Sequence, residues 1–156
     1  MRQEPSLEPL LGQTGVGSGP VPKWILVAED YDAIRELWTT VLGQAGYRVL
    51  GARNGREALD LIRTVVPDLV TLDLRMPEMD GPAFLQALAS SPGLRRIPVL
   101  IVSGFLGDES FSPSLGLNIV GRVSKPLRPA ELVAAVQAAL QRSGAPSAGV
   151  SLPSPR

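Results

Sequence analysis

The chain has 156 residues, with fifteen basic and fifteen acidic side chains, so its formal net charge is zero. Cysteine and histidine are absent, which excludes disulfides, thiolate zinc sites and histidine catalysis and leaves oxygen ligands for any metal ion. No basic cluster predicts direct contact with nucleic acid, and no run of about 18 apolar residues predicts a membrane span. We therefore expect a cytoplasmic protein that binds neither nucleic acid nor membrane.

Both ends of the chain have the composition of flexible segments. Residues 1–22 are rich in Gly, Pro, Gln and Ser, and residues 143–156 in Ser, Gly, Ala and Pro. The sequence predicts a flexible leader over 1–22, one folded domain over 23–142 and a flexible tail over 143–156. Neither end is expected to hold an output domain.

Between these ends, short apolar runs alternate with helical periodicity, a pattern typical of βαβ units and a parallel sheet. One connection breaks the rhythm, because residues 104–118 contain Pro113, three glycines and several serines and lack a clean apolar stripe. We expect the fourth helix, in this connection, to be irregular or shortened. The five strands are predicted at residues 24–28, 48–52, 69–72, 97–102 and 119–123.

Local signals predict where several helices begin and end. Asn54 is a plausible N-cap with Glu57 as its capping-box partner, Pro67 ends that helix, and Pro82 suits the first position of the next. Gly43 or Gly46 ends the first helix. The apolar residues expected to face the core from the helices are Ile34, Leu37, Trp38, Val41, Leu42, Ala58, Leu59, Ile62, Val65, Phe84, Leu85, Leu88, Leu132, Val133, Val136 and Leu140.

Polar residues follow four of the predicted strands: Glu29-Asp30, Asp73, Ser103 and Ser124-Lys125. The carboxyl ends of parallel strands meet at one edge of a sheet, so we expect these side chains to converge there. Taken singly, each is equally well explained as a cap, a turn residue or an exposed charge. Together, three carboxylates against one lysine leave an excess of negative charge that Mg²⁺ relieves. Asp73 can then attack phosphorus, with Lys125 and Ser103 on the phosphoryl oxygens.

The ordered set of Glu29-Asp30, Asp73 with the following Met76-Pro77-Glu78-Met79-Asp80-Gly81, Ser103-Gly104 and Lys125-Pro126 resembles the receiver domain of bacterial two-component response regulators. The resemblance covers about residues 23–142. It implies a doubly wound, flavodoxin-like α/β sandwich around a five-stranded parallel sheet in the order 2-1-3-4-5. We therefore expect a stand-alone receiver domain.

The resemblance also implies residue roles. Asp73 is the implied phosphoacceptor, and the implied donor is a histidine kinase, a histidine phosphotransfer protein or a small molecule such as acetyl phosphate. The signal would pass to an unidentified protein target. The implied Mg²⁺ ligands are Glu29, Asp30, Asp73 and the backbone carbonyl of Arg75. The residues implied for phosphoryl binding and switching are Ser103, Gly104 and Lys125.

The sequence departs from the family pattern at two positions. Glu29 stands where Asp is more common, and Arg122 stands where the family usually carries the Tyr or Phe of its conformational switch. We expect an altered switch, with the 104–118 segment reordering on phosphorylation. Arg75 and Phe105 flank the expected path of hydrolytic water and should tune the lifetime of the phosphoryl group.

Two other classes of function remain open. A degenerate receiver-like module would act by binding partners without phosphorylation. An aspartyl-phosphate phosphatase would need a general acid two residues after its nucleophile, where this chain has Arg75. As a receiver, the protein would be no enzyme beyond catalysing its own phosphorylation and dephosphorylation.

Overall fold

A computed structural model describes residues 21–104 and 116–149, with side chains described as far as residue 143. Its five strands form one parallel sheet in the order β2-β1-β3-β4-β5, which confirms the predicted fold class. The strands are β1 (Trp24–Ala28), β2 (Arg48–Ala52), β3 (Leu69–Leu72), β4 (Val99–Ser103) and β5 (Ile119–Ser124).

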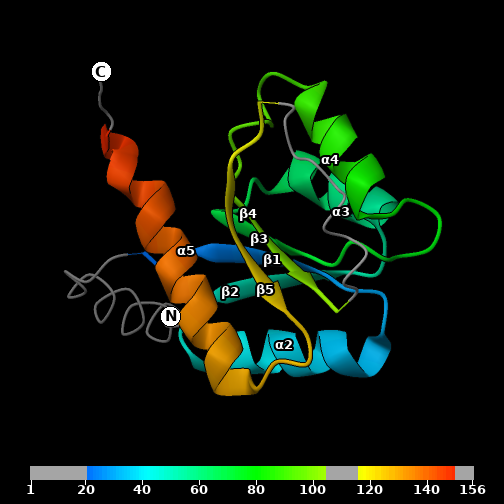
Figure 1. The fold of residues 1–156 in the computed structure, drawn as a ribbon, viewed down its shortest axis with the longest axis vertical. Helices are drawn as coiled ribbons and strands as arrows, with labels where there is room; N and C mark the ends of the chain where they lie inside the picture. Colours follow the sequence, from blue (N-terminus) through cyan, green and yellow to red (C-terminus); the bar gives the residue numbers. More distant parts are fainter. Residues whose placement is uncertain (1–20, 105–115, 150–156) are drawn as a thin grey trace, which may run out of the picture.

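Helices cover both faces of the sheet, as Figure 1 shows. The helices α2 and α5 pack together on one face, and α3 and α4 pack together on the other. The described helices are α2 (Asp32–Gln44), α3 (Gly55–Thr64), α4 (Gly81–Ala89) and α5 (Pro129–Gly149). The connection predicted to be irregular falls largely on residues 105–115, outside the described ranges.

The central strands are buried along nearly their whole length, since β3 and β4 bury every residue and β1 all but its first. Strands that helices cover on both faces consist of nearly continuous apolar residues. Their positions can therefore be predicted from the sequence. The first three strands have the predicted bounds. The strand β4 begins two residues later than predicted, at Val99, and β5 ends one residue later, at Ser124.

Local capping signals place the start of α3 as predicted. The Asn54 side chain accepts a hydrogen bond from the Glu57 backbone N–H at 2.8 Å, and the Glu57 carboxylate accepts one from the backbone N–H of Arg53 at 2.8 Å. The helix ends at Thr64, before Pro67. Pro82 is the second residue of α4 and not the first, because Asp80 is its N-cap.

Two predictions for α2 are refined by the structure. The stripe that α2 buries consists of Trp38 and Leu42, whereas Leu37, predicted to face the core, is 41% exposed. The apolar stripe is therefore narrower than the five residues that share the helical spacing. Of the two glycines predicted to end the helix, Gly46 takes the left-handed conformation, with φ of 102°.

The helix α5 continues through Gly149, past the domain boundary expected at residue 142. Gly and Pro disfavour helix interiors, and the Ser, Gly, Ala and Pro composition of residues 143–156 was the reason for expecting a flexible tail there. Among its described side chains, Leu132, Val136 and Ala139 are buried against the sheet. The domain boundaries remain a prediction. No helix in the described ranges has the length and apolar character needed to cross a bilayer.

Replacing Asn54 with Ala should lower the free energy of unfolding by about 1 kcal/mol, because the first turn of α3 loses its side-chain acceptor. Asn54→Asp keeps an acceptor at the same place and should stay close to wild type. Urea unfolding followed by circular dichroism measures both. Equal stability of the Ala and Asp variants would contradict the capping role.

Candidate functional site

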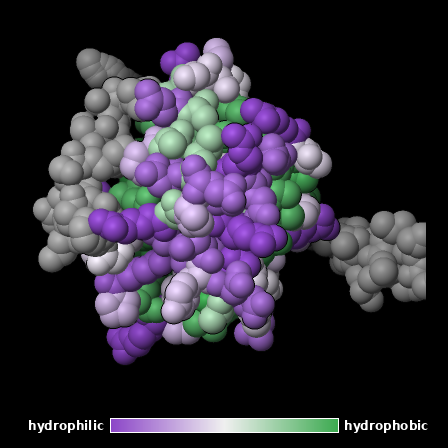
Figure 2. Space-filling model, turned by 90° about the vertical axis from the view of Figure 1, so that its right-hand side faces the viewer, coloured by the Kyte–Doolittle hydropathy of each residue, from purple (hydrophilic) through white to green (hydrophobic). Residues whose placement is uncertain are grey.

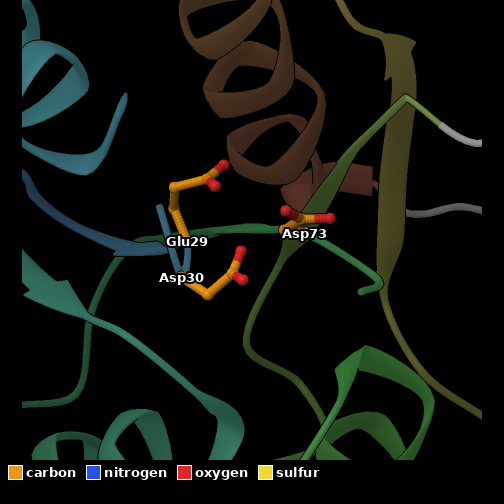
Figure 3. A group of neighbouring side chains, drawn as sticks. All are labelled: Glu29, Asp30 and Asp73. Atoms are coloured by element: carbon orange, nitrogen blue, oxygen red, sulfur yellow. The ribbon is translucent and has the colours of Figure 1, made fainter. Parts of the chain in front are cut away.

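Three carboxylates lie together where β1 and β3 end. Glu29 and Asp30 directly follow β1, Asp73 directly follows β3, and the Asp73 backbone N–H donates to the Ala28 carbonyl at 3.1 Å. One oxygen from each carboxylate lies within 4.8 Å of the other two. Figure 3 shows these side chains side by side on the two neighbouring segments. Glu29 is 3% exposed and Asp73 is 7% exposed, so little water separates their charges.

Lys125 brings the opposite charge and directly follows β5, the edge strand of the sheet. Its backbone N–H donates to the Ser103 carbonyl at 3.0 Å, which extends the pairing of β4 and β5 and sets Lys125 beside Ser103. The Lys125 Nζ lies 2.6 Å from Glu29 Oε1 and 3.1 Å from Asp73 Oδ2. One ammonium thus holds two of the three carboxylates.

The pKa values of this ion-pair group reflect its burial. Burial alone would lower the pKa of Lys125, but the hydrogen bond to Glu29 and the charges of Asp73 and Glu29 outweigh it, so the pKa is raised. For Glu29, burial raises the pKa most and the charge of Asp73 adds to it, while Lys125 only partly offsets them. The pocket therefore favours a proton or another cation beside Glu29.

An open cleft of about 450 Å³ gives access to these groups. Its lining residues include those that directly follow β1, β3 and β5, so it lies at the carboxyl edge of the sheet. Figure 2 shows the face of the molecule that lies on the right in Figure 1, where hydrophilic residues cover most of the coloured surface. The residues that line it are Glu29, Asp30, Tyr31, Ile34, Asp73, Arg75, Ser103, Gly104 and Lys125. The structure thus brings together every described residue predicted to bind the metal or the phosphoryl group.

The loop after Asp73 fixes the direction of its carboxylate. The Arg75 backbone N–H donates to Asp73 Oδ1 at 3.0 Å, and the Gly81 N–H donates to the Leu74 carbonyl at 3.0 Å. A Cβ at position 81 would lie 2.6 Å from Leu74 Cα and 2.9 Å from the Asp73 carbonyl oxygen. Only glycine fits there, so Gly81 allows the loop that follows Asp73 to fold back against Leu74.

One predicted residue, Arg122, lies apart from this group. The side chain of Arg122 is exposed on β5, and Arg122 is not among the described residues that line the cleft. The fold therefore places the guanidinium at the surface and not in the interior. Phe105 lies outside the described residues. Arg75 is exposed at the rim of the cleft.

Three residues near the site were not predicted from the sequence. Tyr31 and Ile34 line the cleft, although the helical spacing placed Ile34 with the core. Arg35 donates from Nη1 to the Glu29 carbonyl at 2.9 Å. The position of Tyr31, directly after the acidic pair, was a usable signal, whereas the contact of Arg35 depends on a side-chain conformation that no sequence pattern shows.

Comparison with known proteins identifies the family. Residues 25–137 match the family described as the response regulator receiver domain. The chain belongs to this family. Receiver domains are signalling proteins of two-component systems that interact with histidine kinases or phosphotransfer proteins and with downstream targets.

Bacterial relatives resemble this receiver over most of its length. It is 36% identical over 120 residues to protein Rrf1 of Nitratidesulfovibrio vulgaris, and the matched region covers 77% of this chain and 84% of that protein. It is 35% identical over 109 residues to the polar-differentiation response regulator DivK of Brucella anthropi, covering 69% and 87%. The solved receiver domain of a signal transduction histidine kinase from Syntrophus aciditrophicus has a TM-score of 0.68 at 33% identity, covering 77% and 91%.

Receiver domains generally bind Mg²⁺ at an acidic pocket, and the donors present here fit that ion. Mg²⁺ prefers a few carboxylates together with water and phosphate oxygens over a closed protein cage. Three carboxylate oxygens that lie within 4.8 Å of one another beside an open cleft meet this preference. Among the described residues, Lys125 is the positively charged side chain that forms ion pairs with this carboxylate group, through Glu29 and Asp73.

Without divalent cations, Glu29→Gln should stabilise the protein more at pH 7 than at pH 4.5. A raised pKa means that the folded protein binds the Glu29 proton more tightly than the unfolded chain does. The contribution of Glu29 to the free energy of unfolding therefore falls as the pH rises from the unfolded pKa through the folded one, and Gln removes this fall. Urea unfolding at several pH values measures the difference. Glu36→Gln, at an exposed position of α2, is the control, and a pH-independent difference for Glu29→Gln would contradict the prediction.

Proposed function

We propose that this receiver accepts a phosphoryl group on Asp73 from the phosphohistidine of a kinase or phosphotransfer protein, with Mg²⁺ present. Acetyl phosphate would serve as a small-molecule donor. The observation that supports this most is the position of the Asp73 carboxylate, 3.1 Å from Lys125 and within 4.8 Å of the other two carboxylates. An isolated turn residue needs no such surroundings.

The chemistry follows from these contacts. An Asp73 carboxylate oxygen attacks phosphorus while the donor's phosphorus–nitrogen bond breaks and its electron pair returns to the imidazole nitrogen. Lys125 moves from the Asp73 carboxylate to a phosphoryl oxygen, where its point charge is well suited. Ser103 and the backbone of Gly104, both lining the cleft, bind the other phosphoryl oxygens. The Arg75 N–H keeps Asp73 oriented during the attack.

Glu29, Asp30, Asp73 and the backbone carbonyl of Arg75 would hold Mg²⁺. When bound, the ion neutralises charge on the phosphoryl oxygens that one lysine cannot balance alone. Glu29 is already engaged in this structure, because its Oε1 lies 2.6 Å from Lys125 Nζ. The Glu29 side chain is one methylene longer than that of aspartate and reaches Lys125. Glu29 would contact the ion through a bridging water.

Signalling would follow from altered protein–protein contacts of a cytoplasmic receiver with an unidentified target. Arg122 occupies the switch position, and Arg75 and Phe105 are the positions expected to tune the lifetime of the phosphoryl group. The expected reordering on phosphorylation falls largely on residues 105–115, outside the described part of the chain.

One observation favours a second candidate, a receiver-like module that binds partners without phosphorylation. Lys125, which phosphoryl transfer requires, already forms an ion pair with Glu29. A protein in which this pair never opened would keep the fold and its surfaces but would not accept a phosphoryl group.

Incubation with acetyl phosphate and Mg²⁺ should add the mass of one phosphoryl group to the wild-type protein and none to Asp73→Asn. The amide is a far weaker nucleophile than the carboxylate and carries no charge for the metal. Intact-mass spectrometry measures the adduct, and added EDTA should abolish it in the wild type.

Asp60→Asn is the matched control, because Asp60 is an exposed aspartate of α3 that lies outside the site. This variant should be phosphorylated like the wild type. Absence of any adduct on the wild type would favour the phosphorylation-independent module. Rapid turnover of many phosphoesters would instead favour a phosphatase.

A further inference from the structure

Arg35 lies in the first turns of α2, directly behind the acidic group. Its Nη1 donates to the backbone carbonyl of Glu29 at 2.9 Å, and its Nη2 lies 2.5 Å from Asp32 Oδ1. The side chain is 18% exposed, whereas that of Asp32 is 76% exposed. The contact with Glu29 is therefore the sheltered one, and the contact with Asp32 is a surface pair of small energetic value.

The contact with Glu29 fixes the peptide that joins the two acidic residues. The Glu29 N–H donates to the Ala52 carbonyl at 2.9 Å. The Glu29 carbonyl belongs to the Glu29–Asp30 peptide bond, so the plane of that bond is set by Arg35. The direction in which the Asp30 side chain leaves the backbone depends on this plane. The guanidinium also offsets part of the repulsion between the neighbouring carboxylates.

Gly51 makes room for this arrangement on the neighbouring strand β2. A Cβ at position 51 would lie 3.2 Å from Arg35 Cδ and 3.3 Å from Arg35 Cγ. Glycine weakens the interior of a strand and often marks a close approach by another group. Here the approaching group is the aliphatic stem of Arg35, which crosses β2 on its way to Glu29.

We propose that Arg35, seated over Gly51, is a positioning residue that sets the Mg²⁺ affinity of the acidic group. It contacts neither the expected ion nor the phosphoryl group, and it acts by holding the Glu29–Asp30 peptide in the orientation that aims Asp30 at Asp73. This inference rests on the proposed function, because it takes Mg²⁺ to be the bound ion. Contacts behind metal ligands typically change metal affinity by about 10- to 100-fold when they are removed.

Isothermal titration with MgCl₂ should show that Arg35→Met weakens Mg²⁺ binding at least about tenfold. Arg35→Lys keeps the charge but donates from a single point, so its loss should be smaller. Gly51→Val leaves Arg35 in the chain but fills the space of its stem, so it should also weaken binding. Valine favours strands, and the free energy of unfolding of Gly51→Val should therefore stay the same or rise while its Mg²⁺ affinity falls.

Two controls separate positioning from general effects on α2. Asp32→Asn removes the surface pair but leaves the Glu29 contact, so its Mg²⁺ affinity should match the wild type within about twofold. Arg63→Met removes an arginine of another exposed pair, three residues from Asp60 on α3, and should also bind like the wild type. Wild-type affinity in both Arg35→Met and Gly51→Val would overturn the proposal.

Amide hydrogen exchange distinguishes failure of this inference from failure of the proposed function. Without metal, Arg35→Met should speed exchange at Asp30 and Tyr31 relative to the wild type, because the turn loses its anchor. If the wild type binds no Mg²⁺, the proposed function fails, and faster exchange in the variant still supports the positioning of the turn. Unchanged exchange overturns the role of Arg35 whether or not Mg²⁺ binds.

Discussion

The two ion pairs of Lys125 with Glu29 and Asp73 are the interaction on which the site depends. Burying two carboxylates beside a third is unfavourable unless a positive charge accompanies them. Lys125 supplies that charge from the end of β5, the edge strand of the sheet. Burial raises the pKa of Glu29, and attraction to the two carboxylates raises the pKa of Lys125. The cleft is therefore arranged for a cation that carries more charge than the lysine alone.

The strand order brings these charged side chains together. Because β1 and β3 are neighbours in the sheet, Asp73 comes to lie beside the acidic pair that follows β1, and the pairing of β4 with β5 places Lys125 beside Ser103. Short contacts behind the site then refine the directions of the side chains. The Arg75 N–H and Gly81 fix Asp73, and Arg35 fixes the turn that carries Glu29 and Asp30.

Features with local causes could be predicted from the sequence. The strands β1, β2 and β3 have the expected bounds because their apolar runs are interrupted by turn residues, and Asn54 caps α3 because Glu57 follows at the right spacing. Features that depend on side-chain conformation could not be predicted. The exposure of Leu37, the reach of Glu29 to Lys125 and the passage of Arg35 over Gly51 arise from tertiary packing that no periodicity encodes.

The separation of 96 residues between Glu29 and Lys125 has a consequence for how the protein matures. On the ribosome, the acidic residues emerge well before the lysine, and loop closure over so long a separation is entropically unfavourable until the intervening strands have assembled. Docking of the last strand therefore brings the lysine to the carboxylates. A nascent or truncated chain that ends before residue 125 would carry the carboxylates without their counter-charge and would be electrostatically frustrated.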